Sequence, residues 1–340
     1  MTLDTVSLGR TGIEVSELAF GTWRFGRRLV DGEERYDVPA EEGVVEVGEE
    51  RAYDLLDAYA ARGGNFIDTA DKYGNGRAEE WVGNWLADRN REDFVIATKI
   101  HRPRRDDPNA RGLNRKHLRN QIDVCLDRLG TDYIDLLYCH RWDDRTPAEE
   151  AMRTLDGLVA DGKVNYLGLS SGSPDAWKVV RANEIARREG YEPFTVTQPR
   201  YNLVDREIEP NYLPMCRDYD LGIVPWSPLG WGFLTGKYTR EDRPEESTAS
   251  TENAFADQYL TEENFAALDV LLSVADEVDA TPAQVALAWQ VHHDDITAPI
   301  VGARTVDQLE ENLAASDVSL TDAQVERLTE AKSFSLPNPY

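Results

Sequence analysis

Four side chains that can take part in proton chemistry follow short apolar runs of the sequence. Asp68 ends the run NFID, and Tyr73 lies in the loop after it. Lys99 ends DFVIATK, and His140 ends YIDLLYCH. A lysine ammonium beside a phenol favours the phenolate and lowers its pKa, and an aspartate paired with the lysine makes its burial tolerable. A histidine could orient an oxygen-bearing substrate or help to relay a proton, so the set suits proton delivery to a carbonyl oxygen.

Each of these residues also has a purely structural interpretation. Asp68 could cap a turn, which the neighbouring Asp71 would do equally well, and Lys99 could be a solvated strand end. His140 alone is more often a structural histidine, and Tyr73 alone would be loop packing. The catalytic interpretation therefore depends on a fold that brings these strand ends together.

The apolar runs recur with helical stretches between them, at residues 50–62, 77–89, 115–129, 147–161 and 174–188. The runs show no alternation of polar and apolar residues, which indicates a parallel sheet buried on both faces. Counting residues 18–21, there are eight such runs, which predicts a closed (β/α)8 TIM barrel. The second possibility, an open doubly wound sheet, would want a GxGxxG after its first strand, and the chain has none. In a barrel the carboxyl ends of all strands meet at one face, where active sites lie.

The rest of the chain fits one barrel domain spanning residues 1–340. Two short strands around the Gly9–Gly12 turn predict an N-terminal β-hairpin that caps the barrel. Residues 25–50 and 230–260 are long loops at the carboxyl face, and loops of this length are usually lids or disordered. Four N-caps are predicted to begin helices, at Thr146, Thr281, Thr305 and Thr321.

The net charge of −26, from 63 acidic and 37 basic residues, argues against a nucleic-acid partner. Only 7 of the basic residues are lysine. Acid-rich, lysine-poor chains resemble those of halophilic archaea, where molar salt shortens the Debye length to about 3 Å and screens self-repulsion. An ordinary acidic cytosolic protein is the alternative.

Other sequence features narrow the class of protein further. Cys125, Cys139 and Cys216 have no CxxC spacing and are expected to be reduced, mostly buried thiols of a cytoplasmic protein. The five histidines contain no HxH or HExxH, so no metal site is predicted. There is no apolar run of eighteen residues and no N-terminal basic-then-apolar segment, so neither a membrane span nor a secretory signal is expected.

Along nearly its whole length the sequence resembles the aldo-keto reductases. The matching stretches, in family order, are LGRTGIEVSELAFGTW, NFIDTADKYGNGRAEEWVGNWL, VIATK, YIDLLYCHRWD, LGLSS, QPRYNL, PWSPLGWGFLTGKY and IVGARTVDQLEENL. The resemblance implies a TIM barrel that uses NADPH without a Rossmann fold. It also implies a catalytic set of Asp68, Tyr73, Lys99 and His140.

The resemblance places the cofactor as well. It implies contacts from Gly21, Thr22, Trp23 and Asp68; from Ser170, Ser171 and Gln198 to the nicotinamide carboxamide; from Trp226 to the nicotinamide ring; from Ser227, Pro228, Leu229, Gly230 and Lys237 to the pyrophosphate; and from Gly302, Arg304, Gln308, Glu311 and Asn312 to the adenosine end. Two positions depart from the family pattern. Ser171 is usually Asn, which would weaken one hydrogen bond or make it water-mediated, and Gln308 stands where many relatives have Arg.

Arg304 precedes a capped helix start, where a 2′-phosphate would meet both a guanidinium and a helix N-terminus. This favours NADP over NAD. The alternative is a surface arginine that pairs with Asp307 or Glu311.

Two functions from different classes fit the resemblance. The first is NADPH-dependent, reversible reduction of aldehydes or ketones to alcohols, and the second is an NADPH-binding sensor or channel subunit with little turnover. His140 favours turnover, because the relatives that serve as channel subunits have Asn at the matching position. A small carbonyl or alcohol substrate is expected, in a pocket lined by Trp23, Tyr73, His140, Trp142 and the two long loops.

Overall fold

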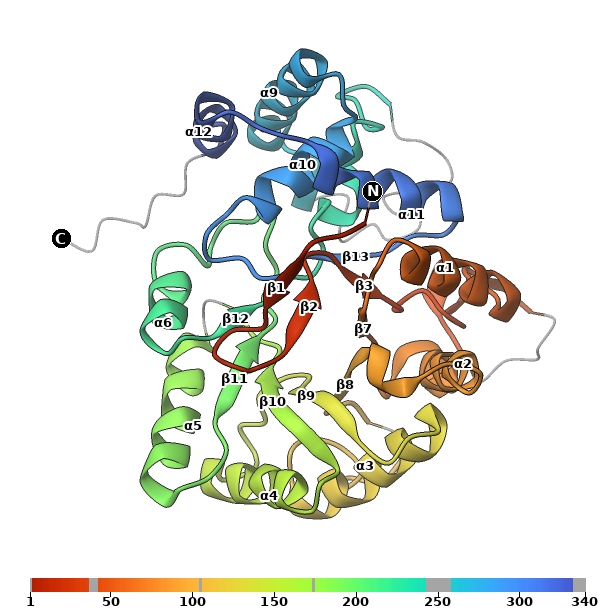
Figure 1. Cartoon of the computed structure of the whole chain (residues 1–340), viewed down its shortest axis with the longest axis vertical. Coiled ribbons are helices and arrows are strands. Elements are labelled where there is room, and N and C mark those ends of the chain that lie inside the picture. The colour runs from red at the N-terminus through yellow and green to blue at the C-terminus, as the bar shows by residue number, and fades with distance from the viewer. Residues whose placement is uncertain (1, 37–41, 104–105, 173–174, 243–257, 333–340) are drawn as a thin grey trace.

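The computed structural model describes residues 2–36, 42–103, 106–172, 175–242 and 258–332. Its centre is an eight-stranded parallel sheet (Figure 1). In chain order the strands are β3 (Ala19–Gly21), β7 (Phe66–Asp68), β8 (Val95–Ile100), β9 (Ile134–Cys139), β10 (Val164–Leu169), β11 (Phe194–Thr197), β12 (Gly222–Ile223) and β13 (Ile300–Val301).

The sheet closes into a (β/α)8 barrel. Neighbouring strands follow chain order from β3 to β12, and β13 pairs with β3. The remaining gap is bridged by backbone hydrogen bonds, from the Thr297 amide to the Ile223 carbonyl at 2.8 Å and from the Ile300 amide to the Pro225 carbonyl at 2.9 Å. The prediction of a closed barrel is therefore confirmed, and the open doubly wound sheet is wrong.

Helices follow the strands and surround them (Figure 1). They are α1 (Glu49–Ala61), α2 (Arg77–Leu86), α3 (Arg115–Leu129), α4 (Ala148–Ala160), α5 (Ala176–Glu189), α6 (Tyr212–Asp218), α9 (Glu262–Val278), α10 (Pro282–Val291), α11 (Val306–Leu313) and α12 (Asp322–Glu330). None of these helices is both long enough and apolar enough to span a bilayer, within the residues that the structure describes.

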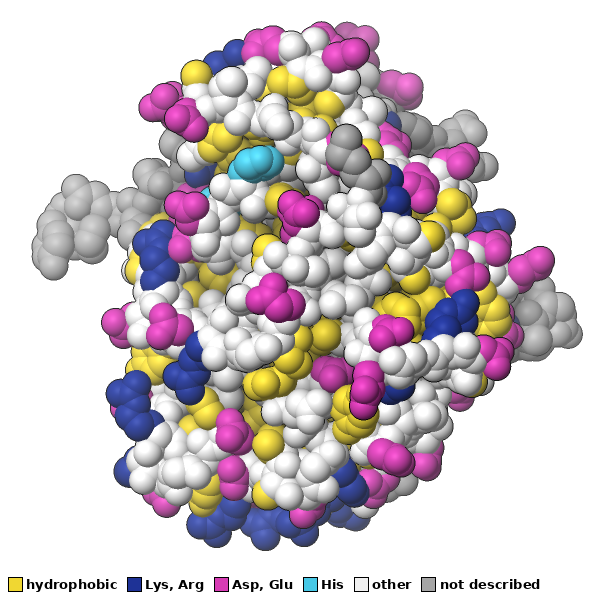
Figure 2. Space-filling view, viewed as in Figure 1, with side chains coloured by type: hydrophobic (Ala, Val, Ile, Leu, Met, Phe, Trp, Pro, Cys, Tyr) yellow, Lys and Arg dark blue, Asp and Glu magenta, His cyan; other side chains and the backbone are white. Residues whose placement is uncertain are grey.

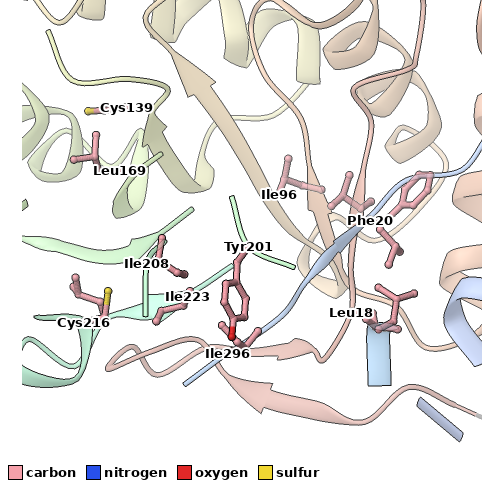
Figure 3. Close-up of a cluster of buried hydrophobic side chains, with 14 of the residues drawn as sticks. Leu18, Phe20, Ile96, Cys139, Leu169, Tyr201, Ile208, Cys216, Ile223 and Ile296 are labelled. Carbon is pink, nitrogen blue, oxygen red and sulfur yellow. The ribbon is translucent and has the colours of Figure 1, made fainter. Parts of the chain in front are cut away.

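Successive residues of a barrel strand enter two different core layers. On β9, Leu136 and Tyr138 belong to an inner cluster inside the barrel, whereas Leu137 and Cys139 belong to the larger cluster between strands and helices. Figure 3 shows part of this outer layer, including Cys139 and Leu169. Because both faces of each strand are buried, the sequence shows continuous apolar runs without alternation.

The predicted hairpin is present as β1 (Thr5–Ser7) and β2 (Glu14–Ser16), which pair antiparallel. It lies across the amino-terminal end of the barrel (Figure 1), where Leu8 and Val15 join the inner cluster. Its turn sits against the barrel wall at Gly9, where a Cβ would lie 2.4 Å from the Gly222 amide nitrogen. Only glycine fits this contact, since Gly9 also has a φ of +56°.

The prediction of a long loop over residues 25–50 is wrong in part. This segment contains β4 (Arg28–Val30), β5 (Glu33–Glu34) and β6 (Val44–Val45), which form a small antiparallel sheet. We call residues 24–48 the strap. Its strands are too short, and too exposed at Val44, to leave a periodic apolar pattern. Residues 37–41 of this segment and 243–257 of the second long loop lie outside the described residues, and the second loop begins with the 3-10 helix η4 (Gly230–Thr235).

Three of the four predicted N-caps are confirmed. The Thr281, Thr305 and Thr321 side chains each accept a hydrogen bond from a backbone amide three residues on. The prediction for Thr146 is wrong, because its hydroxyl donates to Asp143 Oδ2 at 2.6 Å and α4 has no side-chain cap. The three cysteines, which all lie in described segments, are free and buried as predicted.

Candidate active site

Asp68, Tyr73 and Lys99 meet at the carboxyl end of the barrel. Lys99 Nζ lies 2.5 Å from Asp68 Oδ2, 2.8 Å from the Thr69 carbonyl oxygen and 3.1 Å from the Tyr73 hydroxyl. The Lys99 side chain is fully buried, and Asp68 is nearly so. An ammonium has three donors, and each of them has an acceptor here.

Strand register and a braced loop produce this geometry. β7 and β8 pair with Asp68 opposite Ala97, so that Lys99 extends two residues beyond Asp68. The loop then returns over β8, because the Thr69 amide donates to the Ala97 carbonyl and the Asp71 amide donates to the Lys99 carbonyl. The chain turns sharply into the 3-10 helix η1 (Tyr73–Gly76), which begins at Tyr73.

A buried amide completes the set of contacts on Asp68. Gln198, just after β11, donates from Nε2 to Asp68 Oδ1 at 2.8 Å, so both carboxylate oxygens are engaged. The resemblance predicted Gln198 only as a contact of the nicotinamide carboxamide. Gln198 directly follows a strand, as the catalytic candidates do, and this was the one signal in the sequence. No local pattern links Gln198 to Asp68, which lies 130 positions away.

Burial reverses the direction of the pKa shift that the sequence predicted for the Tyr73 phenol. The sequence predicted that Lys99 lowers the pKa of Tyr73, but burial raises that pKa by more than the nearby ammonium lowers it. For Lys99, burial alone would lower the pKa, and the Asp68 and Tyr73 side chains raise it. At neutral pH the site therefore holds a protonated phenol beside a charged ammonium.

His140 lies against the Tyr73 ring. The two ring centroids are 5.9 Å apart with an angle of 85° between the planes. Burial holds the pKa of His140 well below its usual value, and the charge of Lys99 lowers it further. His140 Nδ1 is buried and has no hydrogen-bond partner among the described residues. A neutral imidazole keeps one N–H donor and can orient a polar atom, but at neutral pH it lacks the second proton and the positive charge of an imidazolium.

The two serines after β10 differ in their contacts. Ser170 Oγ donates to the Gln198 carbonyl at 3.1 Å, which keeps it beside the catalytic candidates. Ser171 Oγ is 2.7 Å from the Tyr212 hydroxyl, which also bonds Thr197. Ser171 was expected to make a weaker or water-mediated hydrogen bond to the nicotinamide carboxamide. In the structure its hydroxyl instead hydrogen-bonds to Tyr212, the first residue of α6.

The segment after β12 is a turn braced from several sides. Ser227, Gly230, Trp231 and Gly232 all have left-handed backbone, with φ between 55° and 87°. Asn202 Nδ2 donates to the Ser227 carbonyl, and Gln290 Nε2 donates to the Pro228 carbonyl, both at 2.9 Å. Trp226 begins the turn, and its amide donates to the Pro199 carbonyl.

The residues after β3 connect this turn to the active site. Thr22 donates to the Asp68 carbonyl from both its amide and its hydroxyl. The Trp23 ring packs edge-on against Trp231, with 5.0 Å between centroids. Gly21 allows the close approach of Ile300, whose Cγ2 would lie 2.6 Å from a Cβ at that position.

Arg304 has a partner that the sequence did not indicate. Its Nη2 lies 3.1 Å from Glu46 Oε1, in the strap, and the same carboxylate pairs with Arg24 and Arg27. Arg304 is therefore not simply a surface arginine that pairs with Asp307 or Glu311.

 Glu46 and Arg304 are 258 positions apart in the sequence, so the contact is a product of the fold.

The other residues predicted at the adenosine end lie around the start of α11. Gln308 Oε1 accepts the Arg304 amide at 3.0 Å, and Asn312 Nδ2 lies 3.4 Å from the Gly302 carbonyl. Glu311 contributes its backbone carbonyl to Gln284. The Gln308 side chain thus binds the backbone just before the N-cap of α11 and holds the Arg304 main chain in place.

The cations near α11 form a group that could hold the phosphates of a dinucleotide. Burial lowers the pKa of Lys237, and the charges of Arg304 and Arg24 lower it further, so these three cations lie close enough to repel one another. An anion among them would relieve that repulsion and would also meet the N-terminus of α11. Arg24 is one of these cations, and Glu46 is the carboxylate that pairs with it. The sequence analysis did not identify either residue, because the strap has no motif that marks them.

Comparison with known proteins identifies the family of this chain. The model of the Aldo/keto reductase family matches residues 17–333. The chain belongs to the aldo-keto reductase family. It is therefore an oxidoreductase, and the family uses NAD(P)H.

Several relatives of this aldo-keto reductase cover nearly the whole chain. Norsolorinic acid reductase B of Aspergillus parasiticus is 38% identical over 96% of this chain and 84% of its own length. Norsolorinic acid reductase of Aspergillus flavus is 34% identical over 96% and 80%. A probable voltage-gated potassium channel subunit beta of Oryza sativa subsp. japonica is 36% identical over 92% and 90%.

The buried ion pair of this aldo-keto reductase gives a stability prediction. We expect Lys99→Met to lower the free energy of unfolding by about 3–5 kcal/mol, because Asp68 is left buried without its counterion. The double variant Asp68→Asn with Lys99→Met is expected to lose less than the sum of the two single losses. Chemical denaturation of all three variants measures this coupling.

A surface pair of the same geometry is the control. Lys163 Nζ also lies 2.5 Å from a carboxylate, that of Asp123, but both side chains are exposed. Lys163→Met should change the free energy of unfolding by no more than about 1 kcal/mol. Equal losses for Lys99→Met and Lys163→Met would contradict the importance of burial.

Proposed function

We propose that this chain reduces aldehydes or ketones to alcohols with NADPH, reversibly, and that Tyr73 is the proton donor. The observation that supports the proposal is the chain of contacts from Asp68 through Lys99 to the Tyr73 hydroxyl, with His140 against the same ring. Two of the relatives are named as reductases, which agrees with this direction of the reaction. The general test is the loss of NADPH absorbance with a panel of aldehydes and ketones.

The protein's own residues would manage the carbonyl oxygen. When bound, the reduced nicotinamide supplies a hydride to the carbonyl carbon. Tyr73, kept protonated by burial, donates its proton to the oxygen, and the Lys99 ammonium stabilises the phenolate that remains. Asp68 holds Lys99 in place. Neutral His140 donates a hydrogen bond that orients the oxygen before the proton moves.

Residues around this centre would hold the cofactor. Ser170 and Gln198 would bind the nicotinamide carboxamide, while Ser171 contributes only if its hydroxyl leaves Tyr212. Trp226 would lie against the nicotinamide ring, with Lys237 and the turn after β12 at the pyrophosphate. Arg304 would bind the 2′-phosphate, which is the basis for NADPH over NADH.

A nucleotide-binding subunit with little turnover is the second candidate. The likeness to the rice protein named as a potassium channel subunit favours it. The same absorbance assay separates the two functions, because a sensor would bind NADPH tightly and consume none with any carbonyl compound in the panel.

Replacing the proton donor tests the mechanism. We expect Tyr73→Phe to lower the turnover number by about 10²–10⁴-fold, since the general acid is lost while the ring remains. NADPH binding, followed by quenching of tryptophan fluorescence, should stay close to that of the wild type. Tyr191→Phe is the control, because its hydroxyl bonds to Arg153 outside the site. Turnover of Tyr73→Phe within a few-fold of wild type would exclude Tyr73 as the donor.

Cofactor preference tests the role of Arg304. A charge-assisted hydrogen bond contributes about 1.5–3 kcal/mol, so Arg304→Ala should raise the KM for NADPH by about 10- to 100-fold and leave that for NADH little changed. Steady-state kinetics at one fixed salt concentration measure both values.

Glu46→Gln is the matched control for Arg304→Ala. Both variants remove the ion pair between the strap and Arg304, but Glu46→Gln keeps the guanidinium. If Arg304 binds the phosphate, Glu46→Gln should not raise the KM for NADPH. An equal rise in both variants would mean that Arg304 acts only by holding the strap.

We also propose that the chain is adapted to high salt. The net charge of −26 and the 7 lysines support this, and Figure 2 shows Asp and Glu side chains scattered across the visible face, with a group of Lys and Arg along its lower edge. The melting temperature should rise as potassium chloride increases toward about 1 M, where the Debye length is about 3 Å and repulsion between carboxylates is screened. Thermal unfolding across a salt series measures this, and a flat or falling melting temperature would count against halophilic adaptation.

A further inference from the structure

Three cations surround the catalytic candidates. Lys72 lies in the loop between Asp68 and Tyr73, Arg102 follows β8, and Arg141 directly follows His140 after β9. β7, β8 and β9 are adjacent in the barrel, so these cations stand at neighbouring strand ends on the face that holds Tyr73. Burial lowers the pKa of Arg102, and the charge of Arg141 lowers it further.

These cations lack salt-bridge partners in the part of the chain that the structure describes. Lys72, Arg102 and Arg141 form no salt bridge and no side-chain hydrogen bond with any residue in the described segments, and Arg102 Nε is buried without a partner there. Lys72 and Arg102 are half-buried rather than fully solvated. A cation that is partly buried and unpaired costs free energy, which an anion bound beside it would recover.

The carboxylates near the cluster are already engaged. Glu34 accepts from Arg27 Nε at 3.2 Å and from the Tyr36 hydroxyl at 2.9 Å. Asp143 accepts from the Thr146 hydroxyl and from two backbone amides. Asp71 also acts on Lys72 and Arg102, but its side chain is completely buried. None of the three is a free counterion at the surface of the cluster.

The overall charge of the chain makes this cluster informative. With 63 acidic residues against 37 basic ones, most neighbourhoods offer a carboxylate to each cation. Unpaired cations gathered beside a proton donor therefore favour an anionic ligand. A positively charged mouth on a negatively charged protein would also raise the local concentration of such a ligand and exclude cationic ones.

We propose that the carbonyl substrate carries an anionic group, a carboxylate or a phosphate, and that Lys72, Arg102 and Arg141 bind it. This rests on the proposed reductase function and specifies its substrate class. The carbonyl oxygen would face Tyr73 and His140, while the anion would lie at the outer ends of β8 and β9. Arg102 and Arg141 offer the planar donor forks that suit carboxylate and phosphate oxygens.

Matched aldehydes test the proposal. 4-Formylbenzoate and its methyl ester share the same ring, but only the first is an anion. The ester withdraws electrons more strongly and has the more reactive carbonyl, so a preference for the acid cannot come from carbonyl activation. We expect kcat/KM with NADPH to be about 10- to 100-fold higher for the anion at low ionic strength, and the ratio to fall as potassium chloride is added. 3-Phosphonobenzaldehyde and 3-formylbenzoate, compared in the same way, distinguish a phosphate-type from a carboxylate-type preference. Equal rates for acid and ester, or a preference for the ester, would overturn the proposal.

Variants assign the preference to the cluster. Arg102→Gln and Arg141→Gln should each lower the ratio of kcat/KM for the acid to kcat/KM for the ester at least threefold. Arg119→Gln, on the exposed face of α3, should leave this ratio unchanged. The ratio is the correct readout, because a change in the pKa of Tyr73 would affect both aldehydes equally. An unchanged ratio in both cluster variants would overturn the assignment.

A binding measurement separates this proposal from the proposed function. If neither aldehyde is reduced, the reductase function is wrong. Calorimetry with the alcohol products, 4-hydroxymethylbenzoate and its methyl ester, still compares the anion with the neutral molecule. Tighter binding of the anion would support the cluster as an anion site, and equal binding would overturn it.

Discussion

The burial of the Lys99 ammonium is the constraint on which the site depends. A lysine without exposed surface is tolerated only if every donor has an acceptor, and here the acceptors are Asp68, the Thr69 carbonyl and the Tyr73 hydroxyl. All three come from β7 and its loop, so the register between β7 and β8 cannot slip without exposing a charge to the core. The geometry that suits proton transfer is thus the same geometry that makes the charge tolerable.

The barrel closes one side of this centre with an apolar cluster. The hairpin closes the amino-terminal end with Leu8 and Val15, and Tyr138 and Val196 fill the space between the hairpin and the site. At the other end, burial is the largest cause of the pKa shifts of Tyr73 and His140. It raises the pKa of Tyr73 and lowers that of His140, which leaves a protonated phenol beside a neutral imidazole.

Positive charge is concentrated where anions would bind. One group of arginines converges on Glu46 beside α11, and a second group of cations stands around Tyr73. The strap connects the two regions, because Glu46 reaches the first and Glu34 acts on Lys72 and Arg102 in the second. A strongly acidic chain thereby holds cations at two places on its carboxyl face.

The sequence alone determined the barrel and the meeting of Asp68, Lys99 and Tyr73. Apolar runs mark the strands, and parallel strands in a closed barrel must end on one face, so residues at strand ends converge whatever their separation. Tertiary structure decided what has no local signal. The short strands of the strap lack periodicity, and the contacts of Glu46 with Arg304 and of Gln198 with Asp68 join distant segments. The pKa of Tyr73 was predicted in the wrong direction for a related reason, since desolvation depends on every atom packed around the phenol and not on its charged neighbour alone.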